Sequence, residues 1–576
     1  MKKKPQNPGA DRPAPAPVPG DEKGLLQGIR TLSGRDIIQN ILELDNPREA
    51  VRRLPEEDFY WMVKKVGDQD AVLLLELASK EQWQYLLDLE IWDGDRVDVA
   101  GTGAWLERLE QADSARLVQW LFKEGEYLAY YHLFRSLEVL VIENQEEVWE
   151  VPDGFFSLDG VYYLRGVDPG QRPAIERLLR VMADEDSLRF QSLILGLAGV
   201  LPADLEEEMY RLRNVRLAEH GFLPYEEAVA IYSSLDPSRL AHEHIEFLPR
   251  QDVLKADGVL VPSAPLEHVD AGNLLTEAVS STPDPELLDR VRLEFAGLCN
   301  QILSADRTLS PDLDALIKVC RKASSYVNLG LERLCGKDRA AVEQALTRHS
   351  LVSLFQVGFG LALKIKWEAE KWLKGSWFAS HGLEPEFWGE YWGGVLAGIM
   401  EPRPRFFVGQ REGDEAREFQ WLSDLAQCLT VVRRIMVLDG LLARLAEIYP
   451  PGAQVLQEPD LTFRPLLFNL WARRKLKASP SFSALTPSQA KRFMERLRSK
   501  GRDSDPPYSM AAFEGEFVDD FLSFAGDSDS EAASILREAL VLIWQEFQEE
   551  HQWLSPEDMD GRYSKFITIR WSGAER

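Results

Sequence analysis

Three histidines have the residue type and part of the spacing that a zinc site needs. His242 and His244 flank Glu243, so both imidazoles would point to one side of an extended chain, and His268 could add a third ligand. A structural zinc ion takes four ligands, each held by a supporting hydrogen bond, and the sequence offers no fourth residue for this site. We therefore expect ordinary loop histidines and no bound metal.

Two acidic stretches resemble calcium-binding loops only in part. Glu538 stands at the twelfth position of a loop that would begin at Asp527, but Ala532 occupies the sixth position, where glycine is needed. The stretch that begins at Asp93 has Asp98 at the same sixth position. The chain also lacks a GxxxxGK[ST] phosphate loop and a GxSxG nucleophile elbow. These patterns predict no cofactor.

Aromatic residues are concentrated between Trp367 and Trp392, where 26 residues hold five of the 16 tryptophans. Large aromatic side chains either fill the space between helices or line pockets and protein interfaces, and we favour packing because buried aromatics are mainly core residues. If the segment instead contacts a partner or a ligand, the residues that we expect to make the contact are Trp377, His381, Trp388, Tyr391 and Trp392.

An enzyme or a small-molecule sensor would use the same segment as a pocket. In that case His381 would transfer protons, and Glu384 and Glu390 would supply negative charge. This alternative predicts that His381 and a carboxylate converge in a closed cavity, whereas an interaction scaffold predicts an exposed apolar groove.

The charge balance limits the classes of partner. With 66 Lys and Arg against 94 Asp and Glu among 576 residues, the net charge is −28. Such a chain repels nucleic acid and anionic lipid unless its basic residues are segregated, and the longest basic runs, at 473–477 and 491–502, are short. We expect a protein partner and no nucleic-acid partner.

Cysteine usage and the N-terminal residues predict a cytoplasmic protein. Four cysteines without a CxxC pair argue against a disulfide framework, and Cys320 lies on an apolar helical stripe. Residues 1–24 are rich in proline and lack the apolar segment of a secretory signal, so we expect a disordered tail. No window reaches the roughly 18 consecutive apolar residues of a membrane span, and the longest candidate, LVSLFQVGFGLALKIKW, is interrupted by Gln356, Lys364 and Lys366.

The first part of the chain is predicted to form short helices, whose start signals can be recognised in the sequence. The stretches that begin at Leu54 and Ala78 match with an offset of 24 residues, and Gly67 interrupts the helix between them. Further start signals are Ser33 with Asp36, Asn46 with Pro47, and the capping box of Ser79 with Gln82. Helices this short cannot bury their apolar faces alone, so they must stack into a superhelical array, and such arrays usually bind proteins.

The sequence AVRRLPEEDFYWMVKKVGDQDAVLLLELASKEQWQYLLDLEIWDGD resembles the helical-superhelix domain at the cytoplasmic N-terminus of MgtE-type magnesium transporters. This resemblance covers about residues 25–145 and implies a superhelix. Together with VPDGFFSLDGVYYL (151–164) and LRNVRLAEHGFLPYEEAVAIYSSLDP (212–237), the string resembles an uncharacterised family of bacterial cytoplasmic proteins.

The pattern changes after residue 136. Residues 137–166 alternate apolar and polar side chains, and their Asp153-Gly154 and Asp159-Gly160 pairs indicate tight turns, which predicts a small sheet or β-hairpin. Residues 244–273 are interrupted by proline and glycine and are the best candidate for a domain boundary. Helical patterns return from 285 onward, and KFITIRW near the C-terminus predicts a short strand.

These patterns predict a mainly α fold with an N-terminal short-helix superhelical repeat, a small β-hairpin or sheet insertion and a C-terminal helical domain. The expected divisions are a tail at 1–24, the superhelix at 25–145, a mixed segment at 146–270 and a helical domain at 271–576. The function that we expect first is a non-catalytic protein–protein interaction scaffold or regulator. The alternatives are the enzyme or sensor around 367–392 and divalent-cation sensing by the acidic N-terminal array.

Overall fold

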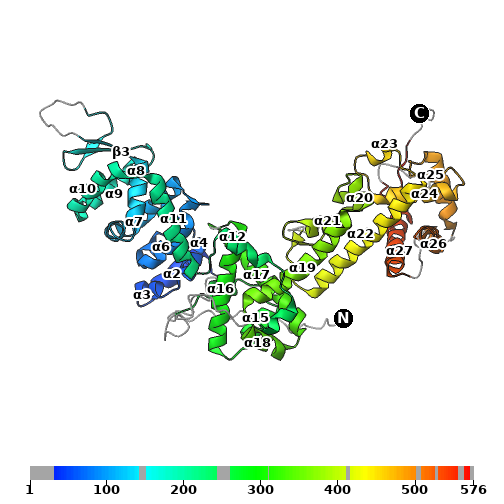
Figure 1. Ribbon diagram of the computed structural model, residues 1–576, viewed down its shortest axis with the longest axis horizontal. Coiled ribbons are helices and arrows are strands. Elements are labelled where there is room, and N and C mark those ends of the chain that lie inside the picture. Colours follow the sequence, from blue (N-terminus) through cyan, green and yellow to red (C-terminus); the bar gives the residue numbers. More distant parts are fainter. Residues whose placement is uncertain are drawn as a thin grey trace, which may run out of the picture. The chain divides into compact units, whose positions relative to one another are not determined.

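The computed structural model describes residues 32–141, 151–242, 260–308, 310–409, 416–500, 508–525, 530–555 and 564–570 (Figure 1). Helices dominate these residues and the strands form small antiparallel sheets, so the predicted mainly α fold is confirmed. The chain divides into two compact units between Val357 and Gly358. The predicted tail at 1–24, Glu243, His244 and Asp527 lie outside the described residues.

Short helices stack at the start of the first unit, as the repeat predicts. They are α2 Gly34–Leu42, α3 Pro47–Arg52, α4 Glu56–Val66, α5 Val72–Leu77 and α6 Lys80–Glu90. Ser79 forms the predicted capping box, Ser33 starts α2 as predicted and does so through a capping box, and Gly67, with a φ of 96°, ends α4. Helices α4, α5 and α6 each pack against the helix two places earlier, so the apolar face of every short helix is covered by a neighbour.

A longer helix and the predicted sheet follow. The elements are the hairpin β1 Trp92–Asp93 and β2 Arg96–Val97, then α7 Val99–Leu121, α8 Glu126–Ser136, β3 Leu137–Val141, β4 Phe156–Ser157 and β5 Tyr162–Gly166. Helix α7 is kinked at Asp113, whose carboxylate accepts a hydrogen bond from the Arg116 N–H and so restarts the helix. Strands β4 and β5 are joined by the predicted Asp159-Gly160 turn, where Gly160 has a φ of 75°.

The rest of the first unit includes a buried helix pair, α16 Pro285–Asp306 and α17 Leu313–Cys335. The other elements of this part are α9 Arg172–Glu185, α10 Ser187–Gly196, η1 Leu197–Gly199, α11 Pro202–Glu219, α12 Tyr225–Ala228, η2 Val229–Tyr232, η3 Pro237–His242, α14 Ala264–Glu267, α15 Leu274–Ser281 and α18 Arg339–Arg348. Helices α16 and α17 pack against each other, and Cys299 meets Cys320 in the core between them. All four cysteines are free thiols, as expected.

The second unit is a helical domain with an aromatic core. Its elements, beginning with the helix that contains the division, are α19 Leu351–Leu373, α20 Trp377–Ser380, η4 Pro385–Trp388, α21 Glu390–Met400, β6 Phe406–Phe407, β7 Ala416–Arg417, α22 Leu422–Ile448, α23 Ala453–Leu456, α24 Phe463–Lys475, α25 Pro487–Leu497, β8 Ser499–Lys500, β9 Tyr508–Ser509, η5 Ala511–Phe513, α26 Glu514–Leu522 and α27 Glu531–His551. The strand expected near the C-terminus is a single bridge between Ile569 and Leu485.

Candidate functional site

The five aromatic-segment candidates are divided between the core and the surface of the second unit. Trp388 and Trp392 are buried, and both indoles pack against Phe463 of α24. Trp377 is half-buried, whereas His381 and Tyr391 are exposed. Trp377 and His381 line an open hollow of about 800 Å³, and the other three residues do not line it. The structure therefore places two of the candidates at one hollow and two in the core.

The hollow is open to solvent, and both His381 and the carboxylate residue Glu447 line it. His381 is exposed, and its Nδ1 lies 2.8 Å from the Trp377 carbonyl oxygen. The neighbouring buried carboxylate, Asp439, accepts hydrogen bonds from the indole N–H of Trp372 and from the backbone N–H groups of Trp377 and Phe378. Asp439 thus anchors the start of α20, which is a structural role.

His268, the third candidate zinc ligand, is a core residue. Its ring packs on the Trp61 indole with centroids 4.5 Å apart, and its Nδ1 donates to the Ala264 carbonyl oxygen at 2.8 Å. These contacts explain the residue without a metal. Glu243 and His244 lie outside the described residues.

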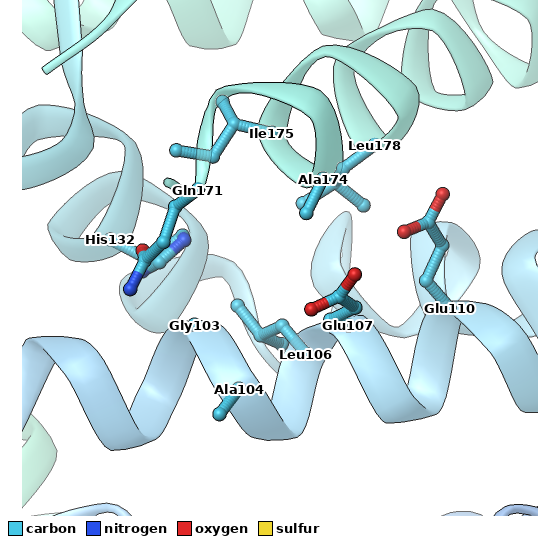
Figure 2. Close-up of a pocket in the computed structure, with 10 residues that line it drawn as sticks. All are labelled: Gly103, Ala104, Leu106, Glu107, Glu110, His132, Gln171, Ala174, Ile175 and Leu178. Carbon is cyan, nitrogen blue, oxygen red and sulfur yellow. The ribbon is translucent and has the colours of Figure 1, made fainter. Parts of the chain in front are cut away.

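A small cavity lies between α7 and α9 in the first unit, with His132 of α8 at one side (Figure 2). Its volume is about 110 Å³. Ten residues line it: Gly103, Ala104, Leu106, Glu107, Glu110, His132, Gln171, Ala174, Ile175 and Leu178. Local signals set these helices in place, because the Asp98 carboxylate caps α7 and Pro173 occupies the first turn of α9.

The polar residues of this cavity form two groups. Figure 2 shows His132 beside Gln171, and Glu107 and Glu110 further along α7. Burial lowers the pKa of His132 to about 4, so the imidazole is neutral near pH 7. Its Nδ1 has no hydrogen-bond partner among the described residues. Glu107 and Glu110 share one guanidinium, with Arg177 nitrogens 2.9 Å and 3.4 Å from their respective oxygens.

A second polar pocket, of about 340 Å³, lies among α4, α6 and α11. Asp88 accepts two hydrogen bonds of 2.7 Å from Arg216, and His220 Nδ1 lies 2.6 Å from Glu57 Oε1. Ligand atoms of Glu56, Glu57 and His220 all lie within 4.8 Å of one another, a spacing that could hold a divalent cation. The hydrogen bond between His220 and Glu57 accounts for these two residues without an ion.

The outer face of α10 exposes large apolar side chains. Leu188 and Leu195, two turns apart on this face, are 75% and 64% exposed, and Leu201 beyond η1 is 64% exposed. Phe190, Leu193 and Ile194 are buried, and the helix packs on α9. Among the described residues no single helix could cross a membrane by length and composition, although Ser187–Gly199 and Pro202–Glu219, bent by 113°, meet this test as a pair.

Sequence reasoning singled out neither the α7–α9 cavity nor the α10 surface. The surface does have a sequence signal: from residue 187 to 201 Arg189 is the only charged residue, in a chain that is 28% charged. His132 has no comparable signal, because it lies within the aromatic stretch EYLAYYHLF and its neighbours Gln171 and Ile175 come from a helix about 40 residues later.

Comparison with known proteins gives a family and no function. A search of the curated proteins found no significant match, and a search of the solved structures found none either. A family whose description is "Family of unknown function (DUF6178)" matches residues 22–570, which is nearly the whole chain. The expectation of an uncharacterised family is thereby confirmed, and the chain belongs to this family of unknown function, DUF6178.

Proposed function

We propose that the protein is a non-catalytic interaction scaffold or regulator that binds a protein partner through the α10 surface, defined as Leu188, Leu195 and Leu201. The observation that carries the proposal is the exposure of these three leucines on one helix and the turn that follows it. Exposed apolar patches usually mark interaction sites, because the free energy falls when a partner covers apolar surface and removes it from water. The inner face of α10 is already buried, so these leucines add nothing to the core.

The charges around the α10 surface indicate what kind of partner fits. Residues 184–208 contain seven acidic residues and one basic residue, and two of the acidic residues have basic partners, since Asp186 is paired with Arg189 and Glu208 with Arg211. A partner with apolar anchor residues ringed by lysine and arginine complements this surface. The same acidic residues oppose the negative surface of an anionic membrane, which favours a protein over a lipid bilayer.

Site-specific photocrosslinking tests this proposal. A photoreactive phenylalanine replaces Leu195 in the cell of origin, and a matched chain carries it at Trp553, an exposed apolar residue of the second unit. We expect one adduct of defined mass at position 195 and not at 553. No adduct at 195, the same adducts at both positions, or an adduct of twice the chain mass would contradict a distinct protein partner. If the protein bound lipid vesicles and Leu195→Asp abolished that binding, the α10 surface would bind a membrane and not a protein partner.

Divalent-cation sensing is the second candidate, because Glu56, Glu57 and His220 have ligand spacing. The resemblance of residues 25–145 to the domain of magnesium transporters supports the same candidate. Calorimetric titration with MnCl₂ and ZnCl₂ tests it: His220→Gln should abolish binding, while Glu81→Gln, which changes another residue of the pocket, should not. If His220→Gln and Glu81→Gln bound the metal ions equally well, His220 would not be a ligand and this site would be excluded. A cytoplasmic location, which the four free thiols support, belongs to both candidates.

A further inference from the structure

The α7–α9 cavity has apolar walls and room for a small molecule. Leu106, Ile175 and Leu178 are nearly fully buried and form the walls. A dry apolar cavity of roughly 150 Å³ takes up the six carbon atoms of benzene, so by the same ratio a cavity of about 110 Å³ encloses about four non-hydrogen atoms, and the exposed rim at Ala104 leaves room for the end of a slightly longer ligand. This space does not belong to the α10 surface, and a ligand for it is independent of the proposed function.

One group of cavity residues offers hydrogen bonds without charge. The His132 side chain is buried, and its Nδ1 has no hydrogen-bond partner among the described residues. Leaving such an atom without a partner costs about 1–3 kcal/mol, so a ligand group that bonds to it is favoured. The Gln171 amide lies over Gly103, where a Cβ would come within 2.8 Å of its Oε1. A hydroxyl group can donate to or accept from both side chains.

The other group of cavity residues carries excess negative charge. Glu107 and Glu110 both face Arg177, so two carboxylates share one guanidinium. Glu110 is the more enclosed of the two, with a side chain 9% exposed against 42% for Glu107. Burial raises the pKa of Glu110, although Arg177 opposes this effect. A ligand with one positive charge would neutralise the pair.

We propose that this cavity binds a short amino alcohol, with its ammonium group at Glu107 and Glu110 and its hydroxyl group at His132 and Gln171. The spacing of the polar residues along α7 sets the length of the ligand. Gln171 lies over Gly103, and Glu107 follows four residues later, a rise of about 6 Å along α7. A chain of about four carbons spans this distance between its two polar ends.

Calorimetric titration of the full chain with three matched probes tests the proposal. The probes are 4-amino-1-butanol, 1-butanol, which lacks the charge, and 4-hydroxybutyrate, which reverses it. We expect 4-amino-1-butanol to bind most tightly and 4-hydroxybutyrate not to bind. Glu110→Gln should weaken binding of 4-amino-1-butanol about tenfold or more and leave 1-butanol unchanged. Glu43→Gln, at an exposed position directly after α2, should change neither.

A variant with a filled cavity distinguishes ligand binding inside the cavity from binding of the ammonium group to acidic residues elsewhere on the surface. Ala174→Leu places a larger side chain among the lining residues and should abolish binding of both 4-amino-1-butanol and 1-butanol. Three outcomes would overturn the proposal: no probe binds, 4-hydroxybutyrate binds as well as 4-amino-1-butanol, or binding survives both Ala174→Leu and Glu110→Gln. Circular dichroism of each variant shows that the fold is retained.

Discussion

Replacing His132 with glutamine should make the unfolding free energy of the first unit less dependent on pH. His132 is enclosed by α7, α8 and α9, and burial lowers its pKa from 6.5 to about 4. In the unfolded chain the imidazole takes up a proton near pH 6.5, whereas in the folded unit it stays neutral until about pH 4. Glutamine is polar and does not titrate, so His132→Gln keeps a hydrogen-bonding side chain and abolishes this difference.

The two pKa values of His132 set the size of the effect. They differ by about 2.5, and each pKa unit corresponds to roughly 1.4 kcal/mol, so the full contribution is about 3 kcal/mol. Because the unfolded state binds more protons in this range, the free energy of unfolding is highest above pH 6.5 and falls as the pH is lowered toward 4. About 2 kcal/mol of the loss is already present at pH 5.

Hydrogen–deuterium exchange separates the two units in this measurement. Peptides from α7, α8 and α9 report opening of the first unit, and their protection between pH 7.5 and 5 gives the free energy after correction for intrinsic exchange. Wild type should lose about 2 kcal/mol more than His132→Gln over this range. His551 in α27, whose pKa burial also lowers to about 4, is the control, because His551→Gln should alter only second-unit peptides. Equal pH dependence of first-unit peptides in wild type and His132→Gln would refute the reasoning.

Three further substitutions have defined outcomes. Burial raises the pKa of Asp58 to about 7, so its carboxyl costs wild type about 4 kcal/mol as the pH rises from about 4 to 7, and urea titrations of Asp58→Asn should lack this loss. Gly330→Ala would place a Cβ 2.2 Å from the Leu354 carbonyl oxygen and should destabilise by about 3 kcal/mol in thermal melts, whereas Gly440→Ala, with no atom within 4 Å, should stabilise by up to about 1 kcal/mol. Trp388→Ala should lower the unfolding free energy of the second unit by about 3–5 kcal/mol in guanidinium titrations, and an unchanged midpoint would contradict its place in the core.

Local signals predicted the elements well. The capping boxes at Ser33 and Ser79 and the turn at Gly160 act through hydrogen bonds and φ angles within a few residues, so the sequence reveals them directly. The hairpin of β1 and β2 was not predicted, since each strand has only two residues and shows no alternation.

The candidate sites depend on contacts that the sequence does not display. The aromatic content of residues 367–392 gave no sign of which rings are inside, because Phe463, more than 70 residues later, covers Trp388 and Trp392. The cavity at His132 likewise needs three helices to meet. By contrast, the α10 surface could have been found from its low charge, although only the structure shows that Leu195 points outward.

The affinity of the crosslinked partner for variants of the α10 surface tests the central claim most directly. The partner is purified and titrated against wild type, the double variant Leu188→Asp with Leu195→Asp, and Leu42→Asp, which changes an exposed leucine of α2. Two buried anchor residues at an interface are worth several kcal/mol, so the double variant should bind roughly a hundredfold more weakly while Leu42→Asp binds as wild type does. Equal affinity of the double variant and wild type would show that the α10 surface is not where the partner binds.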